Sequence, residues 1–174
     1  MDGGKPQKVA DLACYASWSP DGNYLFYGDS NWPFQSHIMD LRTGVVVPTL
    51  KDFGSGFWLN QETLVVRNKQ YTKFVTFNLK TQKLKDLAPD PLGDIETWMI
   101  SPDAKYIYFT TKGDDPRAMR LRVADHQLET ITSLKDLHRT ANNNGEINIA
   151  PDGSPIFTRD TGYEEIYALN IRWP

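Results

Sequence analysis

The chain has one cysteine, Cys14, among its 174 residues, so no disulfide can form within it. It has no apolar run near the ~20 residues of a membrane span and no signal-peptide core at its N-terminus. Charge of one sign does not accumulate either, because 19 basic and 22 acidic residues are scattered along the chain. We therefore expect no membrane span and no nucleic-acid contact by this segment, and the sequence leaves its compartment open.

Long amphipathic helices are missing as well. No run with helical periodicity exceeds two turns, whereas aromatic residues make up 12% of the chain and 12 glycines and 11 prolines interrupt it. This composition favours an all-β fold in a single domain covering residues 1–174. Cys14 then lies in an inner strand, where a small buried hydrophobic side chain is its simplest role.

A short turn sequence recurs between apolar runs. Its copies are Ser19-Pro20-Asp21-Gly22, Ser101-Pro102-Asp103-Ala104 and Ala150-Pro151-Asp152-Gly153. Proline fixes φ at the first turn position and Asp and Gly tolerate the next ones, so each copy predicts a β-hairpin. Pro20 and Pro102 are 82 residues apart, or two steps of 41, and a degenerate copy with Trp58 in place of Trp18 fills the midpoint.

Two more strands are expected after each hairpin. The third strands begin near His37, Phe74, Ala118 and Ile166, and fourth strands follow the first three near Val45, Leu84 and Leu128. Units of ~40–50 residues built from strands alone are typical of propeller blades. We predict a β-propeller or partial β-propeller of about four four-stranded antiparallel blades, at about residues 12–50, 56–88, 95–133 and 145–174, with residues 5–11 as a strand that could close the ring.

These repeats resemble a known family. The segment Trp18-Ser19-Pro20-Asp21-Gly22, followed by an aromatic strand, resembles the TolB-like and WD-repeat-like β-propeller repeat of bacterial proteins. Residues 165–174 are similar to the ends of bacterial propeller proteins, including regulators with an N-terminal winged-helix domain. The resemblance implies a propeller of usually six to eight blades, often in the periplasm or cell envelope. Four blades therefore leave two alternatives open, a closed four-blade ring or a part of a larger propeller, such as one of two assembled halves.

Catalytic and metal-binding motifs are missing from the sequence. The segment Gly54-Ser55-Gly56 lacks the spacing of a nucleophile elbow, and we interpret it as a loop that links two blades. Asp114-Asp115 lies between Gly113 and Pro116, as in a tight polar turn. Three histidines share no metal-ligand spacing with one another or with the cysteine: His37, His126 and His138. We expect no enzymatic activity, no metal and no cofactor.

Candidate binding residues lie where the repeat is broken, on loops gathered at one face. The loops between second and third strands and the connections between blades share the face opposite to the Pro-Asp-Gly turns. Five residues on these loops suit a binding surface: Trp32, Phe34, Arg117, Arg159 and Tyr163. The alternative is that Trp32 and Phe34 only pack over the edge of their blade.

Three functions fit these observations. The first is a non-enzymatic binding or scaffold module that presents one loop face to a protein or a small molecule. The others are the sensory propeller of a bacterial transcriptional regulator and the accessory propeller of a peptidase. Strand edges left open by an incomplete ring also predict self-association.

Overall fold

The computed structural model describes residues 8–11, 13–29, 35–88, 92–137, 147–159 and 161–162, and every regular element among them is a β-strand. The described strands form three four-stranded sheets and one two-stranded sheet. Blade 1 contains β1 (Ala13–Trp18), β2 (Tyr24–Asp29), β3 (Ser36–Asp40) and β4 (Val46–Leu50). Blade 2 contains β5 (Phe53–Trp58), β6 (Thr63–Asn68), β7 (Phe74–Asn78) and β8 (Lys83–Asp86). Blade 3 contains β9 (Ile95–Ile100), β10 (Tyr106–Thr111), β11 (Arg117–Arg122) and β12 (Leu128–Ser133), and blade 4 contains β13 (Ile147–Ile149) and β14 (Pro155–Phe157).

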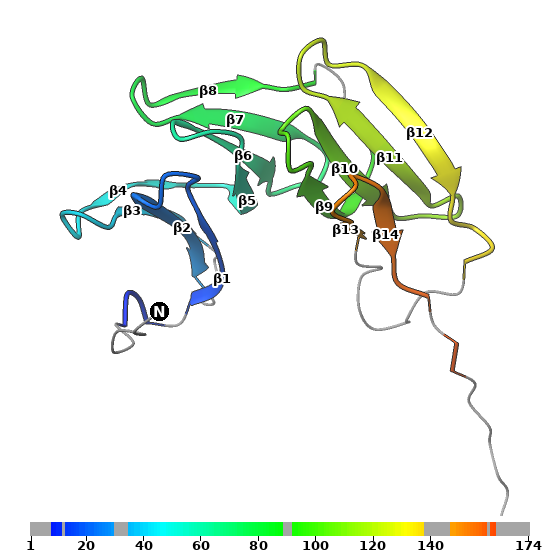
Figure 1. The fold of residues 1–174 in the computed structure, drawn as a ribbon, viewed down its shortest axis with the longest axis horizontal. Coiled ribbons are helices and arrows are strands. Elements are labelled where there is room, and N and C mark those ends of the chain that lie inside the picture. The colour runs from blue at the N-terminus through cyan, green and yellow to red at the C-terminus, as the bar shows by residue number, and fades with distance from the viewer. Residues whose placement is uncertain are drawn as a thin grey trace, which may run out of the picture.

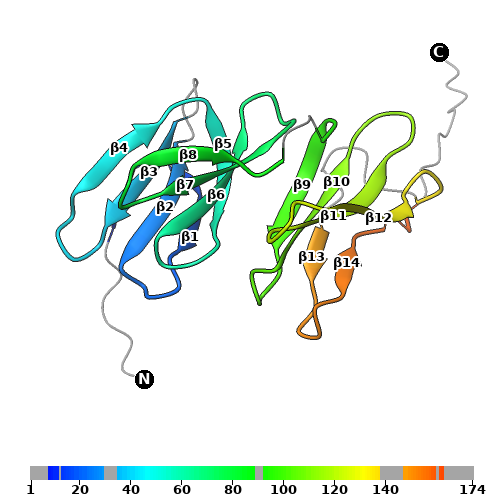
Figure 2. The ribbon, with the colours of Figure 1, turned by 90° about the horizontal axis from the view of Figure 1, so that it is seen from above.

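Each blade is an antiparallel meander whose strands pair in chain order. The blades follow one another around an open arc with β1 and β14 at its two ends (Figure 1). Seen from above, blades 1 and 2 lie on one side and blades 3 and 4 on the other (Figure 2). The chain is therefore a partial β-propeller, which confirms the predicted all-β fold class and its antiparallel blades.

The recurring Ser-Pro-Asp turn forms the same hydrogen bonds wherever it occurs. In blade 1 the Ser19 hydroxyl donates to Asp21 Oδ1 over 2.6 Å and accepts from the Tyr24 N–H over 2.9 Å. In blade 3 Ser101 makes the corresponding bonds, over 2.7 Å to Asp103 and 2.9 Å from the Tyr106 N–H. The repeat is thus a structural motif that closes the first hairpin of a blade.

The degenerate second copy of the turn forms the same kind of hairpin with Asn60 in place of the Ser-Pro-Asp sequence. The Asn60 side-chain carbonyl accepts from the N–H groups of Glu62 and Thr63, over 3.0 and 2.9 Å. Trp58 pairs with Leu64 as Trp18 pairs with Leu25, so the two tryptophans occupy the same position in their strands. Asparagine can replace the motif because its amide oxygen satisfies turn N–H groups as a hydroxyl or carboxylate does.

The core lies between consecutive blades. Between blades 1 and 2 it contains Phe26, Ile38, Leu50, Trp58, Leu64, Val66, Val75 and Phe77. Between blades 2 and 3 it contains Val65, Phe74, Leu87, Ala88, Ile95, Trp98, Ile107, Phe109 and Leu121. The strands of blade 2 contribute to both clusters, which explains the continuous apolar run at the centre of β6.

The predicted loop at Gly54-Ser55-Gly56 is wrong, because these residues lie inside β5. The reason is a close approach between blades. A Cβ atom at position 56 would lie 2.9 Å from the ring of Phe26 and 3.0 Å from Val66. Glycine suits a turn, but within a strand it often marks such a close approach, and only the structure distinguishes the two.

The proposed ring-closing strand is only partly described. Residues 8–11 belong to no strand, and residues 5–7 lie outside the described residues, as does the third strand expected after residue 164. No described strand of blade 1 pairs with a described strand of blade 4. Among the described residues there is no helix long and apolar enough to cross a membrane.

Candidate functional site

The loops between second and third strands gather with the connections between blades. The Lys69 N–H donates to the Asp52 carbonyl, the Ile95 N–H to that of Tyr71, and the Lys112 N–H to that of Asp94. Each of these bonds joins the β6–β7 or the β10–β11 loop to the chain that enters the first strand of a blade, which is β5 in blade 2 and β9 in blade 3. On the other face, the Leu41 N–H donates to the Asn23 carbonyl and so joins the two remaining turns of its blade. The predicted division into two loop faces is therefore present in the described blades, and we call the first one the loop face.

Of the five predicted binding residues, two are described. Arg117 starts β11 and donates from Nε and Nη2 to Asp115 Oδ2, over 2.9 and 2.5 Å. Arg159 is exposed and follows β14. The other three, Trp32, Phe34 and Tyr163, lie outside the described residues, so this site stays a prediction.

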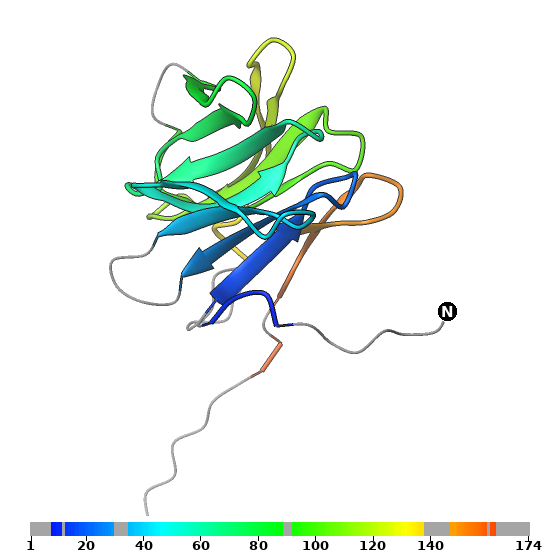
Figure 3. The ribbon, with the colours of Figure 1, turned by 90° about the vertical axis from the view of Figure 1, so that its left-hand side faces the viewer.

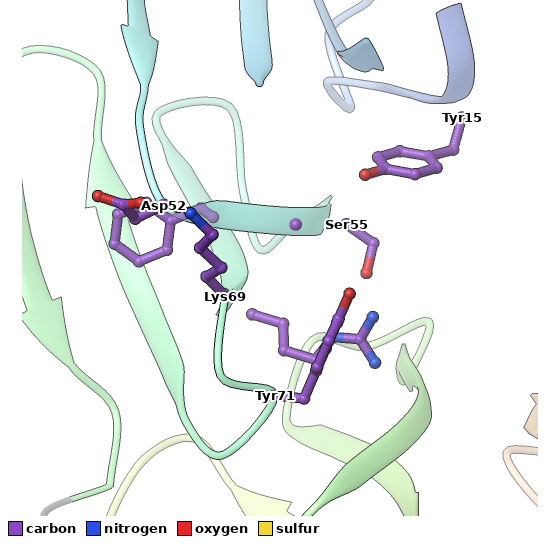
Figure 4. Close-up of a pocket in the computed structure, with 8 residues that line it drawn as sticks. Tyr15, Asp52, Ser55, Lys69 and Tyr71 are labelled. Carbon is purple, nitrogen blue, oxygen red and sulfur yellow. Dashed lines mark hydrogen bonds and ion pairs between the residues drawn. The ribbon is translucent and has the colours of Figure 1, made fainter. Parts of the chain in front are cut away.

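A pocket of about 360 Å³ opens between blades 1 and 2. Its walls come from β1, from β5 and the connection before it, from the end of β6, and from the β6–β7 loop, as Figure 4 shows. The lining residues are Tyr15, Asp52, Phe53, Gly54, Ser55, Arg67, Lys69 and Tyr71. Its volume lies at the lower end of the range for small-ligand sites, ~300–1,000 Å³.

Arg67 provides a partly buried positive charge in this pocket. Its guanidinium lies 4.3 Å from the centre of the Tyr71 ring, and its Nη1 donates to the carbonyls of Ile95 and Glu96 over 3.1 and 2.7 Å. Burial lowers the pKa of Arg67, while Tyr71, Tyr15 and Asp94 act in the opposite direction. Its Nε is buried and has no hydrogen-bond partner among the described residues. The charge is therefore held in place but only partly compensated.

Tyr15 and Ser55 form the wall opposite this cation. Figure 4 shows Ser55 between the rings of Tyr15 and Tyr71. The Ser55 hydroxyl accepts from Trp98 Nε1 over 2.9 Å, which fixes it to blade 3. Tyr15 packs over Gly28, where a Cβ atom would lie 2.2 Å from its ring, so only glycine permits this ring position. Contacts with neighbouring strands therefore fix the positions of both side chains in this wall.

Asp52 and Lys69 form the outer rim of the pocket. Lys69 Nζ lies 3.3 Å from Asp52 Oδ1, and both side chains are more than half exposed. An exposed ion pair of this kind contributes little to stability. A ligand anion could therefore take the place of Asp52 beside Lys69 at a small cost in free energy. Asp52 and Tyr71 also adopt positive φ values, 68° and 60°. Such backbone strain persists only where the surroundings enforce it, and it clusters at binding sites.

The pocket combines apolar area, hydroxyl groups and more positive than negative charge. Two cations, Arg67 and Lys69, face one carboxylate, Asp52. It therefore suits a group that carries a carboxylate or another anion beside apolar or aromatic surface. No pattern in the sequence marks this pocket, because Arg67 and Tyr71 come from one blade and Tyr15 from another. The only signal available was an arginine directly after the apolar run Leu64-Val65-Val66.

The remaining chemical candidates lie apart from this pocket. Asp115 is bound by Arg117, which lowers the pKa of its carboxyl, as expected in a polar turn. His37 stacks on Tyr27 with 5.1 Å between ring centres, and His126 occupies the turn before β12. His138 lies outside the described residues, and of Cys14 only its place in β1 is described. Within the described ranges no three His, Cys, Asp or Glu side chains gather closely enough to hold a metal ion.

Comparison with solved structures shows the fold. TolB from Acinetobacter baumannii matches 94% of this chain with a TM-score of 0.64 and 21% identity. A protein named as TolB from Agrobacterium tumefaciens matches 89% with a TM-score of 0.65 and 17% identity. Hydrazine synthase from Kuenenia stuttgartiensis matches 92% with a TM-score of 0.60 and 18% identity. No protein-family model matches the sequence, and a search of curated proteins found no relative.

These matches confirm the TolB-like propeller predicted from the repeats, at the level of the fold. The chain spans 42%, 61% and 46% of the lengths of these three proteins, which is less than two thirds of each. The likeness to these proteins therefore concerns the fold of this chain and not an activity.

Proposed function

We propose that this chain is a non-enzymatic binding module whose loop face receives a protein partner through the pocket between blades 1 and 2. One observation carries the proposal: the Arg67 guanidinium is held under Tyr71 in a pocket that Tyr15 also lines, and among the described residues no carboxylate forms an ion pair with it. A partly desolvated cation interacts more strongly with an incoming anion than an exposed one does. An acidic side chain of the partner therefore fits this pocket, with Tyr15 and Tyr71 covering its apolar part.

The loop face supports the proposal in two further ways. It collects segments from different blades, which is how repeat proteins build extended binding surfaces. The sequence also predicts anchors on the second-to-third loops of this face, which would widen the contact beyond the pocket: Trp32, Phe34, Arg117, Arg159 and Tyr163.

Peptide selection tests the proposal. We would select peptides from a random phage-displayed library on the immobilised chain and measure the affinity of the selected peptides by calorimetry. We expect them to contain Asp or Glu and to bind Lys69→Glu and Tyr71→Ala at least about tenfold more weakly than the unchanged chain, a loss of about 1.4 kcal/mol.

The matched control is Lys80→Glu. Lys80 is exposed and paired with Glu62, as Lys69 is exposed and paired with Asp52, but it lies in the β7–β8 turn on the other face. It should leave affinity unchanged. Selected peptides that bind the Lys69 and Tyr71 variants as well as the unchanged chain would contradict the pocket as the site.

The absence of catalysis is part of the same proposal. Neither the sequence motifs nor the pocket brings a nucleophile, a base and an orienting group together. We expect no turnover in esterase, peptidase and glycosidase panels. Turnover that disappears when a single polar residue of the loop face is changed would show that the chain is an enzyme.

A further inference from the structure

Three arginines in the described part of the chain stack on tyrosine rings, with 4.3 to 5.3 Å between guanidinium and ring centre: Arg42 on Tyr24, Arg67 on Tyr71 and Arg120 on Tyr106. A carboxylate completes two of these pairs. Arg42 donates to Asp40 over 2.7 Å, and Arg120 donates to Glu129 over 2.6 Å. The pair in the pocket differs, because Arg67 donates to main-chain carbonyls and forms no ion pair with a described carboxylate. Among the described residues, this pair alone is without an anion.

The guanidinium of Arg67 offers one donor to the pocket. Its Nη1 donates to two carbonyls and its Nε is buried, whereas its Nη2 makes no hydrogen bond to a described residue. The Ser55 hydroxyl accepts from Trp98 Nε1, and its own proton has no acceptor among the described residues. Figure 4 shows the hydroxyls of Ser55 and Tyr71 pointing toward one another. An anion in this pocket can therefore accept from a guanidinium N–H and from hydroxyl groups.

The charge of the lining residues matches a single negative charge. Arg67 and Lys69 are the cations and Asp52 is the one carboxylate among them, which leaves one positive charge in excess. A carboxylate balances this excess. A phosphate monoester carries about −1.5 to −2 at pH 7 and would leave negative charge unbalanced beside Asp52. The pocket therefore favours a monocarboxylate over a phosphate ester.

A carboxylate alone would fill a small part of the pocket. At ~30 Å³ for each water-sized group, about 360 Å³ has room for roughly ten non-hydrogen atoms. Aromatic side chains form much of the remaining lining, namely Tyr15, Phe53 and Tyr71. Tyr15 belongs to β1, which lies toward the viewer in Figure 3, and so adds a wall from a second blade. An aromatic ring joined to the carboxylate suits these walls, because aromatic rings pack favourably on one another.

The Tyr71 wall is fixed before any ligand binds. Its backbone has a positive φ of 60°, its N–H donates to the Asn68 carbonyl over 3.0 Å, and its carbonyl accepts from the Ile95 N–H over 2.6 Å. The Asn68 side chain also accepts from the N–H groups of Thr72 and Lys73, over 2.8 and 2.9 Å. A wall held by these bonds loses little freedom when a ring packs on it, which lowers the cost of binding.

We propose that the pocket between blades 1 and 2 binds a small aromatic monocarboxylic acid. Its carboxylate takes the place at Arg67 that Asp40 and Glu129 hold at the other two arginines, and its ring packs on Tyr15 and Tyr71. The proposal rests on the proposed function in one respect, since both use this pocket and its excess positive charge. An aromatic acid that fills the pocket therefore competes with an acidic partner peptide and regulates its binding.

NMR titration of the purified chain with 3-phenylpropionate tests the proposal. We expect saturable binding with a dissociation constant on the order of 1 mM or below, which a well-placed ligand of this size reaches. Two related probes separate the ring from the charge. The amide 3-phenylpropionamide keeps the ring and propionate keeps the charge, and each should bind at least about tenfold more weakly.

Variants of the pocket locate the binding. Tyr71→Ala and Lys69→Glu should each weaken the binding of 3-phenylpropionate at least about fivefold, because one removes a wall and the other reverses a charge. Tyr106→Ala serves as the control, because Tyr106 also stacks on an arginine, but that arginine already has Glu129 and neither lines this pocket. It should leave the affinity unchanged. A cooperative thermal transition shows that each variant is folded.

Displacement of a selected acidic peptide by 3-phenylpropionate separates this proposal from the proposed function. Peptide binding that depends on Lys69 and Tyr71 but that 3-phenylpropionate does not displace would overturn the aromatic-acid site and leave the proposed function intact. Binding of 3-phenylpropionate that depends on Tyr71, without any selected peptide, would support this site and contradict the proposed function. Binding of the acid no tighter than that of propionate, or unchanged in Tyr71→Ala, would also overturn the proposal.

Discussion

At the scale of single residues, the repeated turns differ in how well their residues suit the backbone. Gly22 and Gly153 adopt positive φ in the first turn of their blades, and in blade 3 the same position is Ala104, with φ of 57°. In the turn between third and fourth strands, Gly44 is replaced by Gln82 and His126, with φ of 54° and 61°. A side chain with a Cβ atom is strained in this region, by roughly 1–2 kcal/mol. Comparison of equivalent positions between blades therefore shows where a turn that favours glycine holds a strained residue with a side chain.

Replacing Ala104 with glycine should stabilise the protein. Relief of the left-handed strain exceeds the extra entropy of glycine in the unfolded chain, so we expect a gain of about 0.5–1 kcal/mol. Urea unfolding measures it. Gly22→Ala is the reverse change at the equivalent position, where no atom lies within 4 Å of the added Cβ, and it should lose a similar amount. An Ala104→Gly variant less stable than the unchanged chain would refute the assignment of strain.

Ser101 controls the acidity of the blade 3 turn. Its hydroxyl bond is the largest cause that lowers the pKa of Asp103 from 3.8 to about 2. A carboxyl whose pKa is lowered by folding stabilises the fold above pH ~4, and this contribution is lost as the pH falls toward 2. Ser101→Ala should therefore raise the pKa of Asp103 and flatten this part of the stability profile. An NMR titration of the Asp103 carboxyl measures the shift, and an unchanged pKa would contradict the role of the hydroxyl.

Trp32 is the predicted anchor outside the pocket. If it binds a partner, Trp32→Ala should weaken affinity by about 2 kcal/mol or more and leave the melting temperature nearly unchanged. If it only packs over the blade edge, the same change should instead cost the ~3–5 kcal/mol of stability typical of a buried aromatic. Calorimetry and thermal unfolding on this one variant distinguish the two, and a stability loss without an affinity loss would exclude Trp32 from the site.

At the scale of elements, one tryptophan joins two blades. Trp58 starts the first turn of blade 2 and is buried against Tyr24 and the Ser17 carbonyl of blade 1. Most blade contacts consist of apolar side chains that pack without direction. The Trp58 indole adds a directional hydrogen bond to the apolar contact between the two blades.

Trp58→Ala should therefore destabilise the protein by about 3–5 kcal/mol, because it leaves a cavity at the contact between blades 1 and 2. Trp58→Phe keeps most of the apolar area and loses the hydrogen bond to the Ser17 carbonyl, so it should cost less, about 0.5–1.5 kcal/mol. Denaturant unfolding of both variants measures the difference. An equal cost for the two would show that the hydrogen bond, and not the volume of the ring, carries the contact.

Elements that repeat could be predicted from the sequence, and elements that occur once could not. The Pro-Asp turns and the alternation of the third strands specify the hairpins and the meander, because each follows from local backbone preferences. The start of β5 at Phe53 was missed because Gly54 and Gly56 also suit a loop. The pocket was missed for another reason. Tyr15, Arg67 and Tyr71 come together only when two blades pack, and no local sequence pattern predicts that contact.

At the scale of the whole molecule, stability is distributed unevenly along the arc. Each blade contacts only its neighbours, so a blade between two others is held from both sides and an end blade from one. Blade 2 has two buried faces, with Val65 and Val66 both fully buried. Blade 4 is described by two strands of three residues each, and its Ile156 is half exposed. Local opening should therefore begin at the ends.

Hydrogen exchange measured by mass spectrometry should follow this gradient. We expect amides of β6 and β7 to exchange last, because their release requires opening of blade 2 from both sides, and amides of β13 and β14 to exchange first. Exchange in β13 and β14 as slow as in β6 would mean that blade 4 is held by more than its contact with blade 3, and it would refute a stability set by neighbouring blades alone.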